Sequence, residues 1–210
     1  MKPVNNILQI AEVYVRELYK NRSANEDLYH NIDHTLEVVE VVKKLSRLEG
    51  VSEKDEEILL IAAWFHDTGY FHCCSGHEEL SSEYAKTFLD KESYPADQTE
   101  IVLNCIKATE CPQNPKNKLE EIICDADLHH LGMPDMTKKS ELLRREFDVK
   151  GIKKTNELEW LKISLDFITK HHFFTVSAQN EYGFQRKLNI AEIEKSIREM
   201  EENKNQIKTF

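Results

Sequence analysis

The sequence has 210 residues, of which 40% are hydrophobic and 31% charged, and its formal net charge is -10. This length allows one domain with a sizeable buried core, while the negative charge disfavours binding to a nucleic-acid backbone. Only 6 Gly and 5 Pro are present, too few for the many tight turns of a β-sandwich or barrel. We therefore expect one helical domain over residues 1–210.

Hydrophobic residues recur with helical spacing from the N-terminus onward. Residues 7–18 and 36–48 each form one apolar face, with a polar loop between them, and Gly50 is placed as a C-cap. Ser52, followed by acidic residues, is a typical N-cap for a third helix. Because residues 58–65 of that helix are apolar on all sides, we expect it to lie in the core.

Five further segments have helical periodicity and are separated by loops rich in Gly, Pro or polar residues. They are residues 77–89, 96–109, 118–131, 140–147 and 156–169. Residues 190–204 form a polar tail with a few apolar positions on one side, which we expect to pack loosely. No strand is evident, so the predicted fold class is all-α, a bundle of about eight to nine helices.

The pattern also bears on where the protein resides. No apolar run reaches the ~20 residues that a membrane-spanning helix needs, and residues 1–6 lead into an amphipathic stretch rather than a signal-peptide core. The 5 Cys show no CxxC spacing and no regular pattern, which argues against a zinc knuckle and a disulfide framework. We therefore expect a cytoplasmic protein with reduced thiols and no membrane contact.

Two adjacent residues, His66 and Asp67, stand at the end of the apolar helix. A charged carboxylate in that position costs several kcal/mol unless it is paired or bound to a metal. For the pair alone, a helix-capping Asp beside a hydrogen-bonded core His is the more frequent arrangement. Other residues must therefore decide whether this pair carries chemistry.

Two more groups of titratable residues favour a functional site. His30 and His34 are one helical turn apart, so both rings could reach a common point. Asp125 and Asp127 lie among aliphatic residues, which suggests a nearby positive charge. The alternative, one acid facing solvent and the other paired with Lys or Arg, explains one carboxylate better than two.

The order of these groups on an all-α chain resembles the HD-domain phosphohydrolase superfamily. The resemblance covers about residues 29–132 and rests on the motifs Tyr-His-Asn-x-x-His-Thr, Phe-His-Asp-Thr-Gly-Tyr, His-Glu-Glu-x-Ser and Asp-Ala-Asp-Leu. The sequence is similar to a small single-domain bacterial branch of predicted metal-dependent phosphohydrolases. The resemblance implies a single HD-like bundle, in which residues 135–205 complete the site.

The resemblance also implies a ligand set of two His and two Asp for one metal ion. These ligands are His34, His66, Asp67 and Asp127. Motif position selects His34 over His30, which would line the mouth of the site and contact substrate. It likewise selects Asp127 over Asp125, which would hold a ligand in place. Such a set suits a divalent transition metal (Mn, Fe, Co, Ni or Zn), with Mg as an alternative.

The implied reaction is hydrolysis of a phosphate ester, a monoester or a diester, by metal-activated water. Asp67 would bind the ion and orient or deprotonate that water. His77 could protonate the leaving group or bind phosphate, and Glu78 could position the nucleophile. Acids in a first helical turn also simply favour the helix dipole, so Glu78 has an equally good structural explanation.

Substrate contacts are predicted at two basic residues. Arg144 could clamp a phosphate with two hydrogen bonds, although an ion pair with Glu141 or Asp148 is more frequent for such a residue. Lys187 lies in a segment that could close over the substrate. The adjacent histidines at positions 129 and 130 are expected to face outward.

The expected partner is a small phosphorylated molecule such as a nucleotide. We expect no nucleic-acid polymer and no membrane as partners, and a homodimer is left open.

Two other functions compete with hydrolysis. A non-catalytic nucleotide- or signal-binding HD domain would keep the fold, but the complete ligand set favours an enzyme. A di-iron oxygenase would need extra His ligands, for which His72 and His77 are available.

Overall fold

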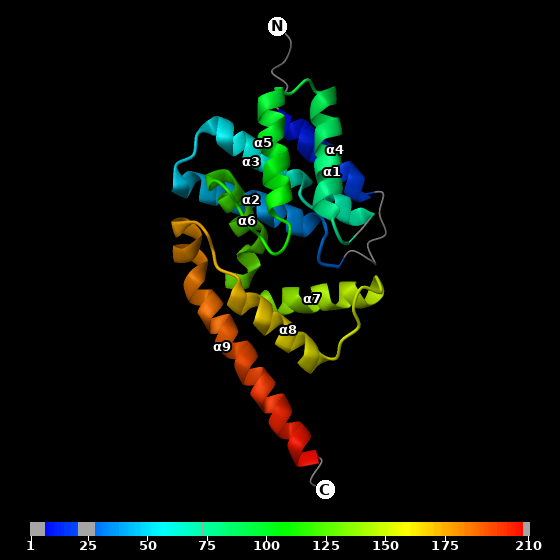
Figure 1. The fold of residues 1–210 in the computed structure, drawn as a ribbon, viewed down its shortest axis with the longest axis vertical. Helices are drawn as coiled ribbons and strands as arrows, with labels where there is room; N and C mark the ends of the chain where they lie inside the picture. The colour runs from blue at the N-terminus through cyan, green and yellow to red at the C-terminus, as the bar shows by residue number, and fades with distance from the viewer. Residues whose placement is uncertain (1–6, 21–27, 73, 208–210) are drawn as a thin grey trace. The chain divides into compact units, whose positions relative to one another are not determined.

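The computed structural model describes residues 7–20, 28–72 and 74–207, without the side chains of 205–207. Within these residues the chain contains nine α-helices, two 3₁₀ helices and no strand (Figure 1). The predicted all-α fold class is thereby confirmed. The expectations for residues 1–6, for the loop at 21–27 and for Cys73 lie outside the described residues. No described helix is both long enough and apolar enough to cross a membrane.

The chain divides into two compact units, residues 1–128 and 129–210. The first unit contains α1 (Ile7–Lys20), α2 (Ile32–Glu49), α3 (Glu53–Phe65), η1 (Thr68–Phe71), α4 (His77–Lys91), α5 (Ala96–Ala108) and α6 (Lys118–Asp127). The second contains α7 (Met136–Val149), α8 (Glu157–Lys170) and α9 (Val176–Ile207), with η2 (Leu128–Gly132) at the junction. A single domain in which residues 135–205 complete the site stays a prediction.

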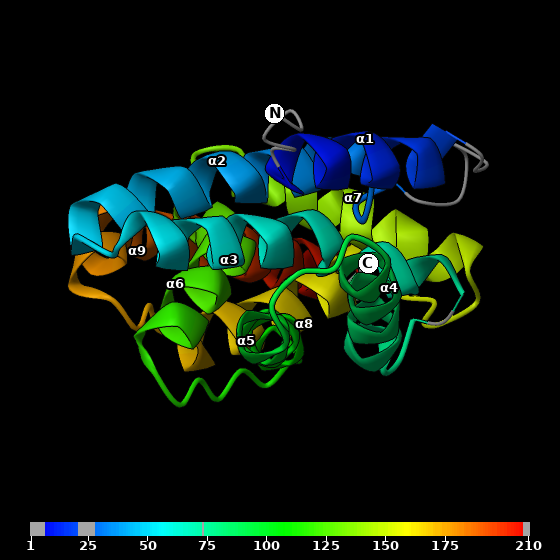
Figure 2. The same cartoon turned by 90° about the horizontal axis from the view of Figure 1, so that it is seen from above.

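The helix α3 is the centre of the first unit. Every residue from Ile58 to Phe65 is buried, as the absence of a polar face predicts. The helix lies between α1 and α2 on one side and α5 on the other (Figure 2). Phe65 closes its C-terminal end by packing against Tyr14 and Phe88, with ring centroids 5.9 and 5.2 Å away.

Two helix ends of the first unit follow the predicted capping signals. Ser52 accepts a hydrogen bond from the backbone N–H of Asp55 at 3.1 Å, and Gly50 ends α2 in the left-handed conformation at φ 67°. The start of α2 is capped by Asn31, whose side chain accepts from the N–H of His34 at 3.1 Å. This cap fixes where α2 begins and places His34 in its first turn.

Three expectations about the second half of the chain are wrong. The helix predicted over 118–131 ends at Asp127 and continues as the tighter 3₁₀ helix η2. This change of winding turns His129 and His130 inward, so both are buried rather than outward-facing. The tail is part of one 32-residue helix, α9. It does not pack loosely throughout, because Ile193 and Ile197 are buried in the second unit.

A close approach of η1 to α4 depends on Gly69. A Cβ atom at this position would lie 2.1 Å from the carbonyl oxygen of His77 and 2.7 Å from the backbone nitrogen of Ser81. The Gly69 N–H also donates to the Ser81 hydroxyl at 2.8 Å. Because both obstructing atoms belong to backbone, a larger residue could be accommodated only by displacing the start of α4.

We therefore expect Gly69→Ala to lower the free energy of unfolding by about 3 kcal/mol, through overpacking and loss of the contact with α4. The measurement is urea unfolding followed by circular dichroism. Gly183→Ala is the control, because no atom lies within 4 Å of a Cβ there. A helical Gly→Ala change should leave stability unchanged or raise it by up to about 1 kcal/mol. Equal stability of the two variants would contradict the close approach.

Candidate metal centre

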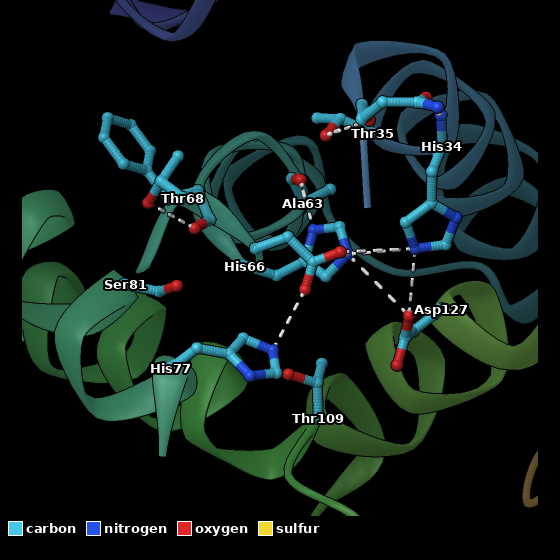
Figure 3. Close-up of polar contacts among 12 residues, drawn as sticks. His34, Thr35, Ala63, His66, Thr68, His77, Ser81, Thr109 and Asp127 are labelled. Atoms are coloured by element: carbon cyan, nitrogen blue, oxygen red, sulfur yellow. Dashed lines mark hydrogen bonds and ion pairs between the residues drawn. The ribbon is translucent and has the colours of Figure 1, made fainter. Parts of the chain in front are cut away.

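The candidate site is assembled from the ends of four helices of the first unit. His34 comes from the first turn of α2, and His66 and Asp67 follow the last residue of α3. His77 opens α4, and Asp127 closes α6. Figure 3 shows the labelled side chains of His34, His66, His77 and Asp127 pointing toward one another. Residues separated by up to 93 positions in the sequence (127 - 34) therefore share one site.

The two imidazole rings of His34 and His66 face each other through their Nε2 atoms. These atoms lie 3.4 Å apart, and the residues are only 4% and 0% exposed. The Nδ1 atom of His66 is 2.8 Å from the carbonyl oxygen of Ala63. Because a carbonyl oxygen can only accept, Nδ1 carries the hydrogen, and Nε2 of neutral His66 keeps its lone pair for the site.

Both carboxylates approach the same two nitrogens. Asp67 Oδ2 lies 3.1 Å from His66 Nε2 and 3.4 Å from His34 Nε2. Asp127 Oδ1 lies 3.3 Å from His34 Nε2 and 3.7 Å from His66 Nε2. The ligand atoms of His34, His66 and Asp127 all lie within 4.8 Å of one another, a spacing at which one metal ion could bind all three.

The second oxygen of Asp67 has a separate contact. Asp67 Oδ1 is 3.2 Å from His77 Nε2, and the same nitrogen is 3.4 Å from Glu78 Oε1. Glu78 is buried, and its other oxygen, Oε2, has no hydrogen bond to any described residue. His77 and Glu78 thus lie beside the Asp67 carboxylate, on the side opposite the two facing imidazoles.

The pKa values of these groups reflect burial and mutual attraction. Burial lowers the pKa of His66, but the carboxylates of Asp67 and Asp127 raise it more, to about 9. Burial raises the pKa of Asp67, yet His66 and His77 lower it well below its ordinary value. Without a metal, the site therefore favours a proton on an imidazole between the carboxylates.

The pKa of His77 is also raised. Burial lowers it, whereas the contact with Asp67 and the charge of Glu78 raise it more. Burial raises the pKa of Glu78 above its ordinary value, although the charge of His77 lowers it. The pair is therefore biased toward protonated His77, and Glu78 is a weaker acid than a solvent-exposed glutamate.

The chemistry of these donors fits a divalent cation. Asp67 Oδ2 is fully buried and makes no well-formed hydrogen bond with the described residues. A buried carboxylate oxygen without such a bond is unfavourable. A cation among the four groups would relieve this penalty, and two nitrogens with two oxygens match the donors that first-row transition metals accept.

His30 and Asp125, the alternatives to His34 and Asp127, do not belong to the group of converging residues. His30 precedes the Asn31 cap and stacks on Tyr70, with ring centroids 3.8 Å apart. Its ring is 6.0 Å from that of His77, so it borders the site without joining the group of converging atoms. Asp125 is fully buried on α6 and is not one of the converging residues.

Two of the three predicted substrate-binding residues, Arg144 and Lys187, belong to the second unit. Arg144 forms the ion pair considered from the sequence, donating through Nε and Nη2 to the Glu141 carboxylate at 2.7 and 2.6 Å. It also donates to the carbonyl oxygen of Thr155 at 3.0 Å. Lys187 is exposed on α9. The roles of both in substrate binding stay predictions.

Two neighbours of the site were not identified from the sequence. Tyr70 lies within the Phe-His-Asp-Thr-Gly-Tyr motif, which could have drawn attention to it. Gln113 lies in the loop between α5 and α6, and its amide donates to Asp127 Oδ2 at 3.2 Å. No local pattern marks that glutamine, because the contact depends on how the loop returns to α6.

Similarity to known proteins identifies the family and the fold of this chain. The model of the HD domain family matches residues 31–207. A predicted HD superfamily hydrolase from an uncultured Thermotogales bacterium shares 20% identity and a TM-score of 0.56, over 94% of this chain and 92% of its own. A Lactobacillus plantarum protein of known structure shares 14% identity and a TM-score of 0.69, over 94% of this chain and 98% of its own. No functionally curated protein matches. At these identities the solved structures establish the fold, and the family match shows that the chain belongs to the HD domain family.

Proposed function

We propose that the protein is a metal-dependent phosphohydrolase with one divalent transition metal ion at the candidate site. The observation that carries this proposal is the 3.4 Å approach of His34 Nε2 to His66 Nε2 between two carboxylates in a buried space. His34, His66, Asp67 and Asp127 would hold the ion. Mn, Fe, Co, Ni and Zn suit this donor set, and Mg is the alternative.

Hydrolysis is the reaction that these groups support best. A bound divalent ion supplies Lewis acidity toward a phosphoryl oxygen and makes water a stronger acid. The hydrolase named among the solved HD structures supports the same reaction type for this chain. We infer a phosphate ester of a nucleotide or of a similar small phosphorylated metabolite as the substrate.

The remaining residues of the site have distinct roles in this proposal. Asp67 uses Oδ1 to orient His77, whose raised pKa favours the protonated imidazole needed to donate a proton to a leaving oxygen. Glu78 contacts the same nitrogen of His77 through Oε1 and can accept a hydrogen bond through Oε2. The half-buried ring of His30, which stacks on Tyr70, borders the site and would offer an aromatic surface to a base.

A di-iron oxygenase is the second candidate, and one contact favours it. Asp67 Oδ1 and His77 Nε2 are 3.2 Å apart, so Asp67 could share a second ion with His77. The other His considered for such a site, His72, is exposed, and its ring lies 6.0 Å from that of Tyr84. Metal analysis separates the two candidates, because one ion per chain supports the hydrolase and two irons support the oxygenase.

Metal binding should raise the thermal stability of the protein. At a Mn²⁺ concentration of about 100 Kd we expect a stabilisation of about 2.7 kcal/mol, which corresponds to a rise in Tm of about 5–10 °C for a chain of this size. Asp67→Asn should remove this rise. Asp90→Asn, which changes an exposed carboxylate paired with Lys86, should keep it. Calorimetry with and without MnCl₂ measures both, and an equal rise in Asp67→Asn would contradict the ligand assignment.

Turnover should require the same centre. In a screen of phosphorylated metabolites with Mn²⁺, Co²⁺, Ni²⁺ or Mg²⁺, we expect phosphate release that chelation abolishes. Asp127→Asn should lower kcat/KM by about 100-fold or more, because one charge-stabilising group is lost. Asp90→Asn again serves as the control. The proposed function is wrong if Asp127→Asn and the wild type release phosphate at the same rate from every substrate that is turned over.

The role of His77 can be tested through the leaving group. His77→Gln keeps a donor for Asp67 Oδ1 but cannot transfer a proton. We expect kcat to fall by about 10²–10⁴-fold for an alkyl phosphate ester, which needs protonation of its leaving oxygen, and far less for p-nitrophenyl phosphate. His72→Gln should affect neither substrate. Equal losses on both esters would show that His77 does not protonate the leaving group.

A further inference from the structure

A glutamine outside the ligand set contacts the most exposed of the proposed metal ligands. Gln113 lies in the loop between α5 and α6, and its Nε2 donates to Asp127 Oδ2 at 3.2 Å. The same nitrogen donates to the carbonyl oxygen of Cys124 at 3.4 Å. Cys124 and Asp127 both belong to the last turn of α6, so one amide spans the end of the helix that carries the ligand.

The orientation of this amide is determined by its partners. The Asp127 carboxylate and the Cys124 carbonyl can only accept hydrogen bonds, so the NH₂ group of Gln113 must face α6. The reverse orientation would bring the amide oxygen against two other oxygens. Gln113 Oε1 is therefore directed away from both, and it is buried with no hydrogen bond to a described residue.

Asp127 needs such a partner more than the other carboxylate does. Its side chain is 14% exposed, against 5% for Asp67, so packing restrains it less. Only Oδ1 of Asp127 faces the two imidazoles. A donor on Oδ2 restrains rotation of the carboxylate, because turning Oδ2 away from Gln113 would break their hydrogen bond.

Two of the other proposed ligands are held in a comparable way. The atom of His66 that faces away from the site donates to Ala63, and the outer oxygen of Asp67 contacts His77. Gln113 makes the same kind of contact with Asp127.

We propose that Gln113 is a positioning residue of the metal centre, which holds Asp127 so that Oδ1 is directed at the ion. This inference rests on the proposed metal site. Residues that orient metal ligands typically alter metal affinity by about 10–100-fold when they are removed. Gln113 would therefore control the affinity and the coordination of the ion without contacting it.

The test is a Co²⁺ titration of the metal-free protein, followed by visible absorption, which reports both affinity and coordination. Gln113→Met keeps the length of the side chain but removes both donors and the acceptor. We expect its Kd for Co²⁺ to rise by about 10–100-fold and its absorption spectrum to change. Asn114→Ala is the matched control, because Asn114 is exposed in the same loop and should leave both measurements unchanged.

Circular dichroism of the metal-free proteins monitors folding in the same samples. If Gln113→Met does not fold, Gln113→Asn takes its place, since its amide is one methylene too short to span both acceptors, and we expect the same direction of change. Wild-type affinity and spectrum in the folded variant would overturn the inference, and so would an equal loss in Asn114→Ala. A wild-type protein that binds no Co²⁺ would instead refute the metal centre itself.

Discussion

A carboxylate at the end of the most buried helix is the constraint on which the first unit depends. The Asp67 side chain is 5% exposed, and a charge at that depth is unfavourable unless other groups compensate it. His66 is its neighbour in the chain, whereas His34 and His77 reach it from other helices. Electrostatic attraction strengthens where water is excluded, so the burial that makes this carboxylate costly also makes the site attractive to a cation.

The chemical groups come from helix ends, where backbone groups lack helical partners and side-chain caps decide where the helix begins. The Asn31 cap sets the first turn of α2 and thereby the position of His34. Gly69 lets the start of α4 approach η1, which brings His77 to the site. The helix α6 ends at Asp127. The starts of α2 and α4 and the end of α6 therefore determine where three of the site residues lie.

Two of the proposed metal ligands are oriented by their neighbours. His66 is held through Nδ1 by Ala63, and Asp67 is held through Oδ1 by His77, so the remaining atom of each faces the same point. Such preorganisation means that binding an ion requires little rearrangement of the side chains. It also separates two tasks within Asp67, because one oxygen faces the proposed metal position while the other sets the orientation and raises the pKa of the proposed proton donor.

The sequence by itself determined the all-α fold class, the caps at Gly50 and Ser52, the burial of α3 and the membership of the HD family, because helical periodicity, capping and short motifs are local in the chain. The residues alone did not decide between His30 and His34, or between Asp125 and Asp127, as members of the site, because the two residues of each pair lie within about one helical turn. The tertiary structure placed His34 and Asp127 beside His66, and it turned His129 and His130 inward against expectation. It alone revealed the contact of Gln113, because that contact depends on a loop returning to a distant helix end.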